Sequence, residues 1–425
     1  MTATKTPSSS ASASASASAS SSSSCCPKPD TDWSSLPRDL LYIVLNKFLL
    51  LSDMIMFSSV CTTRRSVAKN TLQKLKLCPN MYFNRNLPLL LLPCTENNDF
   101  IRSLYSINKG EVYDLQLRVP SNKRIFGSSH GWLITLDEDS FEVILINPFY
   151  FGSTSKGIIR IPQFSAAAEM HKEHGNDGFN SEYFICKAVL SSDPVSCPND
   201  FVLMVIYGEM KMLAYWKPGA ESWTYIAWSL PIFLDIIYVE DRFLAVNTLG
   251  QVYSCKINDE AYPPYNLGMV SAPQFGLLGT FCRRYIVELQ NKVILQVIRM
   301  LKISRMCALT SPIFTIGFFI FENKVNEDGD TVWILVTNLN DGALFLGDNH
   351  SLYVTAFHYP GCRANSIYFT DDYHDTDAML LNPYQLTGPL DIGMYRLDDK
   401  TIERLELPLL EKYHMPPPVW ILPTV

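Results

Sequence analysis

Residues 131–149 read GWLITLDEDSFEVILINPF, two apolar runs of strand length separated by a polar turn. The same pattern of a short apolar run followed by turn residues recurs from Leu87 to Leu422, for example at 201–207, 243–248, 251–257, 331–338 and 351–357. Many short strands at even spacing indicate a sandwich, a barrel or a propeller. We therefore predict an all-β architecture for residues 87–425.

A weak internal repeat favours a propeller among these three folds. Segments 124–162, 183–228, 236–270, 284–338 and 343–407 each resemble two hairpins in tandem. Their period of roughly 40–60 residues suits four-stranded blades. The apolar stretches 87–93 (LPLLLLP) and 419–422 (VWIL) have no local partner, and pairing them within one blade would close the ring. The expected fold is a six-bladed β-propeller closed by strands from both ends of this region.

Composition excludes several broad classes of protein. Of 425 residues, 47% are hydrophobic and 18% charged, which excludes disorder of the whole chain. A net charge of −7 and the lack of a Lys/Arg run argue against a general nucleic-acid binder. The 11 cysteines include no CxxC pair, so we expect reduced and mostly buried thiols. Apolar runs such as 313–321 are too short for a bilayer helix, and we expect no membrane association.

The N-terminal residues have a composition unlike the rest of the chain. Residues 8–24 are only Ser and Ala, and no acidic residue precedes Asp30. Such a stretch buries too little apolar surface to offset the entropy of ordering, so we predict a disordered tail over 1–32. We then expect a cytoplasmic or nuclear protein. A Ser-rich, acid-poor start is also typical of a plastid transit peptide, which leaves organelle import as the alternative.

Residues 33–77 have helical periodicity. Apolar residues recur at helical spacing from Leu36 to Phe48, and Pro37 stands where a first helical turn tolerates proline. A second helix is expected over 54–60 and a third over about 69–77. Three helices of this size bury little surface, so we expect the unit to gain stability from a partner. A linker over 78–86 separates it from the β region.

Two short motifs in the helical unit, LPRDLL (36–41) and FSSVC (57–61), resemble an F-box. Downstream, GSSHGWL (127–133), NPF (147–149), ALFLG (343–347), NSIYFTDD (365–372) and PVW (418–420) resemble plant F-box proteins whose C-terminal half is a KIB-type β-propeller. This resemblance implies a substrate-recognition subunit of an SCF-type cullin-RING ubiquitin ligase, without a catalytic site, cofactor or metal. By position, the residues it assigns to binding of a Skp-type adaptor and to the F-box core are Leu36, Pro37, Leu40, Leu41, Ile43, Leu45, Leu49, Val60 and Cys61. The propeller would hold an unidentified target protein.

One position departs from the F-box pattern. Such motifs usually carry a Trp after the Cys in the third helix, and Arg64 occupies the matching place here. An alternative is therefore a non-catalytic propeller binding module with a degenerate F-box. The helices would then pack as a cap on the propeller.

Other motifs resemble catalytic or metal-binding patterns. Residues 127–131 match G-x-S-x-G, but strand-like residues 132–136 follow where a nucleophile elbow needs a helix, so we predict a tight turn. His171 and His174 lie near Glu169 and Glu173 in the stretch 166–181, which we predict to be a surface loop because it is polar and rich in Asn, Gly and Asp. No second cluster with zinc-type spacing accompanies them, which argues against a metal site. Residues 326–330 (NEDGD) predict a hairpin turn. Two charged sets are expected at the surface: an acidic blade loop (Asp371, Asp372, His374, Asp375, Asp377) and solvated edge cations (Arg299, Lys302, Arg305).

Overall fold

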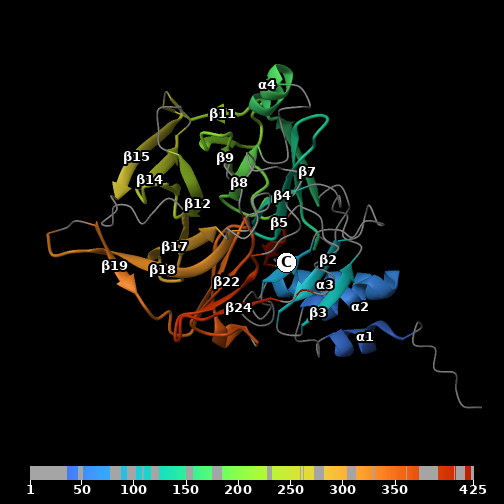
Figure 1. Cartoon of the computed structure of the whole chain (residues 1–425). Helices are drawn as coiled ribbons and strands as arrows, with labels where there is room; N and C mark the ends of the chain where they lie inside the picture. Colours follow the sequence, from blue (N-terminus) through green and yellow to red (C-terminus); the bar gives the residue numbers. More distant parts are fainter. Residues whose placement is uncertain are drawn as a thin grey trace, which may run out of the picture.

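The computed structural model describes most of the chain after residue 35. The described residues are 36–45, 51–76, 88–92, 102–107, 110–115, 124–149, 157–174, 184–226, 232–271, 282–303, 313–328, 331–372, 391–405, 407 and 417–422, with gaps at 259, 262 and 360. They form a six-bladed propeller preceded by helices α1 (Arg38–Leu45), α2 (Leu51–Val60) and α3 (Thr62–Lys76) (Figure 1). The expected tail over 1–32, the linker over 78–86 and Leu49 lie outside the described residues.

Each blade is a separate sheet, and in blades 2 to 5 the strand order follows the chain. The predicted repeats correspond to blades 2 to 6, which confirms the propeller architecture. Blade 2 has β4 (Ile125–Ser129), β5 (Trp132–Leu136), β6 (Glu142–Ile146) and β7 (Ile158–Gln163); blade 3 has β8 (Ile185–Leu190), β9 (Leu203–Tyr207), β10 (Met212–Trp216) and β11 (Thr224–Tyr225); blade 4 has β12 (Phe233–Val239), β13 (Arg242–Asn247), β14 (Val252–Ile257) and β15 (Tyr265–Ser271).

Blades 5 and 6 depart from this regular size. Blade 5 contains the longest described strands, β17 (Ile294–Ile303) and β18 (Ile313–Val325), between β16 (Cys282–Glu288) and β19 (Thr331–Val336). Blade 6 has five strands in the order β21 (Leu352–Thr355), β20 (Gly342–Leu346), β22 (Ser366–Phe369), β23 (Gly393–Arg396) and β24 (Ile402–Arg404). Strands β20 and β22 are parallel, and β21 is the additional strand, at the edge of the sheet beside β20.

Blade 1 closes the ring as the sequence predicts. Strand β1 (Leu89–Leu91) lies between β2 (Arg102–Ser106) and β25 (Val419–Ile421), with β3 (Glu111–Leu115) outermost. The antiparallel register places Leu90 opposite Trp420, whose fully buried indole packs edge-on to Phe345 of blade 6 at 5.2 Å. The N-terminal and C-terminal strands of the β region are thus joined through this pairing.

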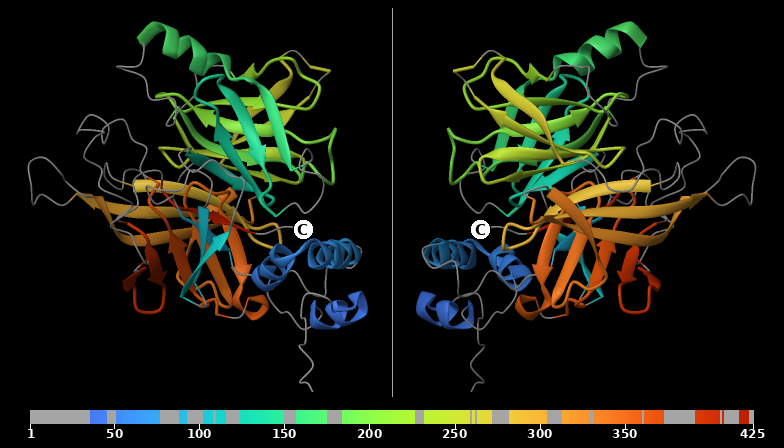
Figure 2. Two further views of the ribbon diagram at one scale, coloured as in Figure 1. Left: turned by 90° about the vertical axis from the view of Figure 1, so that its right-hand side faces the viewer. Right: turned by 90° about the vertical axis from the view of Figure 1, so that its left-hand side faces the viewer.

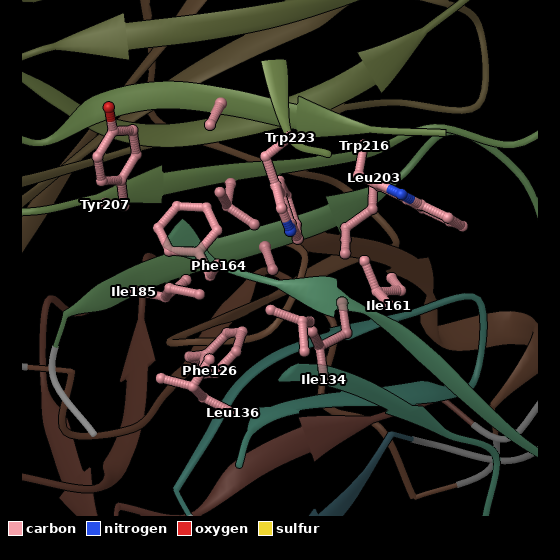
Figure 3. Packing of buried hydrophobic residues seen from close by; sticks show 14 of the residues in the cluster. Phe126, Ile134, Leu136, Ile161, Phe164, Ile185, Leu203, Tyr207, Trp216 and Trp223 are labelled. Carbon is pink, nitrogen blue, oxygen red and sulfur yellow. The ribbon is translucent and has the colours of Figure 1, made fainter. Parts of the chain in front are cut away.

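Successive apolar side chains of a strand point to opposite faces of its blade, so each blade packs against the blades on both sides. Between blades 2 and 3, the Phe164 ring meets Trp223 edge-on at 4.8 Å and Tyr207 at 5.1 Å (Figure 3). Edge-to-face pairs of this kind add about 0.5–1.5 kcal/mol beyond the area they bury. Similar clusters lie between the other blades.

Two expectations about helices are wrong. The stretch predicted as a loop from 166 begins as a ten-residue helix, α4 (Ser165–His174). It forms because Ala167 and Ala168 bury their small side chains in the cluster between blades 2 and 3, while the Tyr225 hydroxyl accepts the N–H of Ala166 at 3.1 Å. Helix α3 begins at Thr62 rather than near Lys69, because burial of Val67 and Ala68 outweighs the modest helix propensity of the Thr-rich start. No described helix is long and apolar enough to cross a membrane.

Candidate functional site

The helical unit has an inner apolar face that belongs to the propeller core. Leu41 and Leu45 of α1 and Phe57 of α2 are buried in one cluster with residues of blades 1 and 2. This cluster also includes Val67 and Ala68 of α3, and on the propeller side Leu89, Leu91, Ile125, Leu133, Val419 and Ile421. The helices are therefore stabilised within the chain, on the side of the propeller near β2 and β3 (Figures 1 and 2).

Five apolar side chains of α1 and α2 are exposed rather than buried in this cluster. Leu40, Ile43 and Val44 of α1 are 46%, 56% and 39% exposed. Met56 and Val60 of α2 are 46% and 60% exposed. A face that places this much aliphatic surface in water has no partner among the residues that the structure describes. We call these five residues the outer helical face.

The structure divides the predicted adaptor-binding set between the two faces. Leu40, Ile43 and Val60 lie on the outer helical face, whereas Leu41 and Leu45 face the propeller and are not available to a partner. Of the remaining members, Pro37 is exposed, Leu36 packs partly against the inner cluster, Cys61 is half-buried, and Leu49 is not described.

Val44 and Met56 are also exposed, although the predicted set does not include them. Val44 follows Leu40 by four residues, so the helical repeat places both on one side, and this spacing alone identifies it. Met56 precedes Val60 by the same interval on α2.

Arg64 is accommodated in α3 without burying its charge. Its guanidinium lies over the Phe57 ring at 5.4 Å, and the side chain is half-exposed. The backbone N–H of Arg64 donates to the Cys61 Sγ at 3.5 Å, which supports the first turn of the helix. The place of the usual Trp is therefore taken by a cation that stacks on an aromatic ring and reaches solvent.

The loop 347–351 (GDNHS) joins β20 to β21 and contacts residues of several other blades. Its Asp348 pairs with Arg124 of blade 2 at 3.0 Å, and its Gly347 carbonyl accepts the Lys187 ammonium of blade 3 at 2.8 Å. Its Ser351 hydroxyl donates to Asp235 of blade 4 at 2.8 Å. The loop therefore connects blade 6 to three others, and we call it the channel loop.

Three buried ion pairs extend this network. Lys187 contacts the Asp235 carboxylate at 2.8 Å, and that carboxylate also accepts the backbone N–H of Ile286 in blade 5 at 3.0 Å. Burial raises the pKa of Asp235, and the Lys187 ammonium opposes the rise. Arg299, fully buried, pairs with Asp391 at 2.9 Å and with Asp372 at 3.1 Å.

The expectation of surface charges is wrong for Arg299 and Asp372. Asp372 also accepts the Tyr285 hydroxyl at 2.7 Å. Arg299 and Asp372 come together from 73 positions apart along the chain. Lys302 is exposed as expected, whereas Arg305, His374, Asp375 and Asp377 lie outside the described residues. The acidic run thus supplies an internal anion to blade 5.

The G-x-S-x-G match is a hairpin turn, as predicted. His130 and Gly131 have φ values of 50° and 75°, and Ser129 pairs with Trp132 across this two-residue turn. The Ser129 hydroxyl accepts the N–H of Leu190 at 3.2 Å. Burial also lowers the pKa of His130, and of His350 to about 3, so both imidazoles are neutral.

Beside the channel loop lies a small cavity. Its volume is about 20 Å³, and its lining includes Lys187, Lys211, Arg283, Arg284 and Tyr285. A cavity of this size holds a water molecule rather than an organic substrate.

His171 of α4 packs on the Phe141 ring, with 5.4 Å between the ring centres. The described residues contain no group of three or more His, Cys, Asp or Glu placed to hold a metal ion.

A model of the KIB1-4 β-propeller matches residues 104–396, from within β2 of blade 1 to the end of β23 in blade 6. The chain belongs to this family. The KIB1-4 match covers more than half of the chain and ends before β25, the strand that completes the ring.

Relatives of this KIB1-4 propeller extend over the helical unit as well. F-box protein SKIP23 of Arabidopsis thaliana is 26% identical and covers 92% of this chain and 95% of its own. F-box protein At2g17036 of the same plant is 23% identical over 92% and 95% of the two chains. These matches confirm the resemblance to plant F-box proteins with a KIB-type propeller. Among solved structures, TolB from Acinetobacter baumannii aligns with a TM-score of 0.34 and 8% identity over 80% of this chain and 68% of its own, which is too low to bear on function.

Proposed function

We propose that this protein is the substrate-recognition subunit of an SCF-type cullin-RING ubiquitin ligase. In this proposal the outer helical face binds a Skp-type adaptor, and the propeller holds the protein to be ubiquitinated. The chain contributes proximity: it raises the local concentration of target lysines near chemistry carried out by other subunits. It needs no catalytic site, cofactor or metal of its own, and its place of action is the cytoplasm or nucleus.

The observation that carries the proposal is the separation of the two helical faces. The inner face is already buried against the propeller, so the fold does not need a partner for stability. The outer helical face, with Ile43 and Val60 more than half exposed, remains available for binding. Full burial of an aliphatic side chain contributes about 1.5–3 kcal/mol, so a few such anchors are sufficient for a stable complex. The names of the relatives, all F-box proteins, agree with this assignment.

Co-purification of the full chain with a Skp-type adaptor tests the proposal. Ile43→Glu and Val60→Glu each place a carboxylate on the outer helical face, and each is expected to weaken adaptor binding by at least about tenfold. Both positions are exposed, so the unfolding midpoint is expected to stay within about 2 °C of the wild type. Ile158→Glu, on exposed β7 of blade 2, is the matched control.

The competing function is a propeller module with a degenerate F-box, and Arg64 favours it. This alternative predicts that the folded wild-type chain binds no adaptor, and that Arg64→Trp restores binding. Adaptor binding by the wild type that Ile43→Glu abolishes and Ile158→Glu preserves excludes the degenerate F-box. Equal binding by all three chains would refute the assignment of the outer helical face.

A further inference from the structure

The outermost strands of the blades differ in how they are protected from pairing with another chain. Exposed sheet edges usually carry charges, proline or a very short strand, because an unprotected edge adds further strands. Strands β11 and β24 have two and three residues. Strand β3 carries Glu111, and β7 carries Arg160 and Pro162. Four of the six outer edges thus have a recognised protective feature.

The outer edge of blade 5 has none of these features. Strand β19 reads TVWILV, six residues without a charge, a proline or a glycine. It is the last strand of its sheet, and no described strand pairs with its outer side. Ile334 and Leu335 are 46% and 49% exposed, and as consecutive residues they point to opposite faces. Both faces of this edge are therefore open to solvent.

The outer edge of blade 4 lies next to it and is also unprotected. Strand β15 reads YNLGMVS, and its Met269 and Val270 are 52% and 47% exposed. The Trp333 indole N–H of β19 donates to the Ser271 hydroxyl of β15 at 2.5 Å. This bond fixes the two edges beside each other, and the buried Trp333 ring anchors β19 to the body of the propeller.

The sheet of blade 5 also extends beyond the ring. Strands β18 and β19 project from the body of the molecule in Figure 1, on the side opposite the helices, and the long strands project again in Figure 2. Exposed apolar residues continue along β18, with Ile316, Phe319 and Val325 at 54%, 40% and 71% exposure. A partner on this side would leave the outer helical face free.

We propose that β19 is the docking edge for the target protein, which adds an extended segment as a fifth strand of blade 5. This inference rests on the proposed function, in which the propeller holds a target. Backbone N–H and C=O groups of β19 would pair with the segment. The exposed side chains of Ile334 and Leu335 on the two faces would select alternating apolar residues in it.

The charge near this edge indicates the chemistry of the segment. The turn that follows β18 exposes Glu327 and Asp328, and Glu322 lies on the preceding strand, with Lys324 as the cation beside it. The local balance is acidic, so the target segment is expected to carry Lys or Arg next to its apolar strand. A second copy of this chain fits less well, because each copy has a net charge of −7.

Site-specific cross-linking tests this inference with the full chain. Benzoylphenylalanine replaces Leu335, and in a control chain Ile158 of β7, and each chain is photolysed in an Arabidopsis cell extract together with the Skp-type adaptor. The expected product joins position 335 to a target segment of alternating apolar residues with adjacent Lys or Arg, mapped by mass spectrometry. A synthetic peptide of the mapped segment is then titrated against the purified full chain.

Matched variants give the deciding comparison. Ile334→Lys is expected to weaken peptide binding by at least about tenfold, since an edge lysine is a protective feature. Ile158→Lys, also on an outermost strand, is expected to leave it within twofold. Leu335→Lys repeats the test from the other face, so that a folding defect in one variant does not decide the result.

Three outcomes overturn the docking edge: cross-links from position 335 to a second copy of this chain, cross-links no more frequent than at position 158, or peptide binding that is unaffected by Ile334→Lys. Adaptor retention is measured on the same samples. If the wild-type chain does not retain the adaptor, the proposed function is refuted. If the adaptor is retained but target cross-links form at positions other than 335, only the docking edge is refuted.

Discussion

Replacing Lys187 by Met tests whether the buried ion pairs hold the propeller together. The Lys187 side chain is 5% exposed, and its ammonium lies 2.8 Å from both the Asp235 carboxylate and the Gly347 carbonyl. Met fills a similar volume but leaves Asp235 in the interior without its counter-ion. Breaking a buried pair by removing one partner costs about 3–5 kcal/mol, a large part of the roughly 5–15 kcal/mol that stabilises a typical protein.

The pH dependence of the variant identifies the cause. Burial raises the pKa of Asp235 and Lys187 opposes the rise, so removing the ammonium raises this pKa further. When the pKa of a carboxyl group is higher in the folded state than in the unfolded state, the protein loses stability as the pH rises from the unfolded-state pKa to the folded-state pKa. The free energy of unfolding of Lys187→Met therefore falls further below that of the wild type between the two folded-state pKa values of Asp235, that of the wild type and that of the variant. This deficit grows by about 1.4 kcal/mol per pH unit and is constant above both pKa values.

Urea unfolding followed by tryptophan fluorescence between pH 5 and 8 measures this deficit. The matched control is Lys256→Met, because Lys256 pairs with Asp241 at the surface, where both side chains are more than half exposed, and such a pair is worth about 0–1 kcal/mol. The double variant Lys187→Met/Asp235→Asn is expected to recover most of the loss, since the amide oxygen still accepts the Ile286 N–H. A deficit as small as that of Lys256→Met, or one that does not change with pH, would refute this account.

Two further predictions concern closure of the ring and the channel loop. Trp420→Ala removes the buried ring that packs on Phe345 and is expected to destabilise the propeller by about 3–5 kcal/mol, measured by urea unfolding; a loss below about 1 kcal/mol would show that β25 does not close the ring. In Gly347→Ala the added Cβ would overlap the Thr370 hydroxyl, and we expect a loss of about 1–3 kcal/mol in the free energy of unfolding in the same assay. Gly219→Ala is the comparison, because Gly219 also has a positive φ but its added Cβ would meet no neighbour.

The propeller could be predicted because its signal is local and repeated. Each blade is a run of hairpins, so a period of apolar runs is visible without knowing which residues meet in space. The pairing of β1 with β25 joins the two ends of the region, yet it was also predictable, because each strand lacks a local partner. The residues around Leu40 illustrate the limit of this approach. Helical spacing shows that α1 is apolar, but not which of Leu40 and Leu41 faces the propeller.

The channel network could not be predicted because its partners are far apart in sequence. Arg124 and Asp348 are 224 positions apart, and Arg299 and Asp391 are 92 positions apart. Near each of them the sequence resembles ordinary edge charges, and only closure of the ring brings them together. Helix α4 was missed for a different reason: its helical face consists of small residues, Ala167 and Ala168, which give little apolar periodicity.

The same network bears on how the proposed receptor would act. The channel loop ties blade 6 to blades 2, 3 and 4 through charged groups that are costly to separate in the interior. The inner face of the helices belongs to the core of blades 1 and 2, so the helical unit is joined to the same body rather than tethered by a linker alone. The outer helical face and β19 lie on opposite sides of that body (Figure 1). A target docked on β19 would therefore be held at a fixed distance and orientation from the adaptor. Such a rigid spacer favours particular lysines of the target, whereas a flexible tether would present many of them equally.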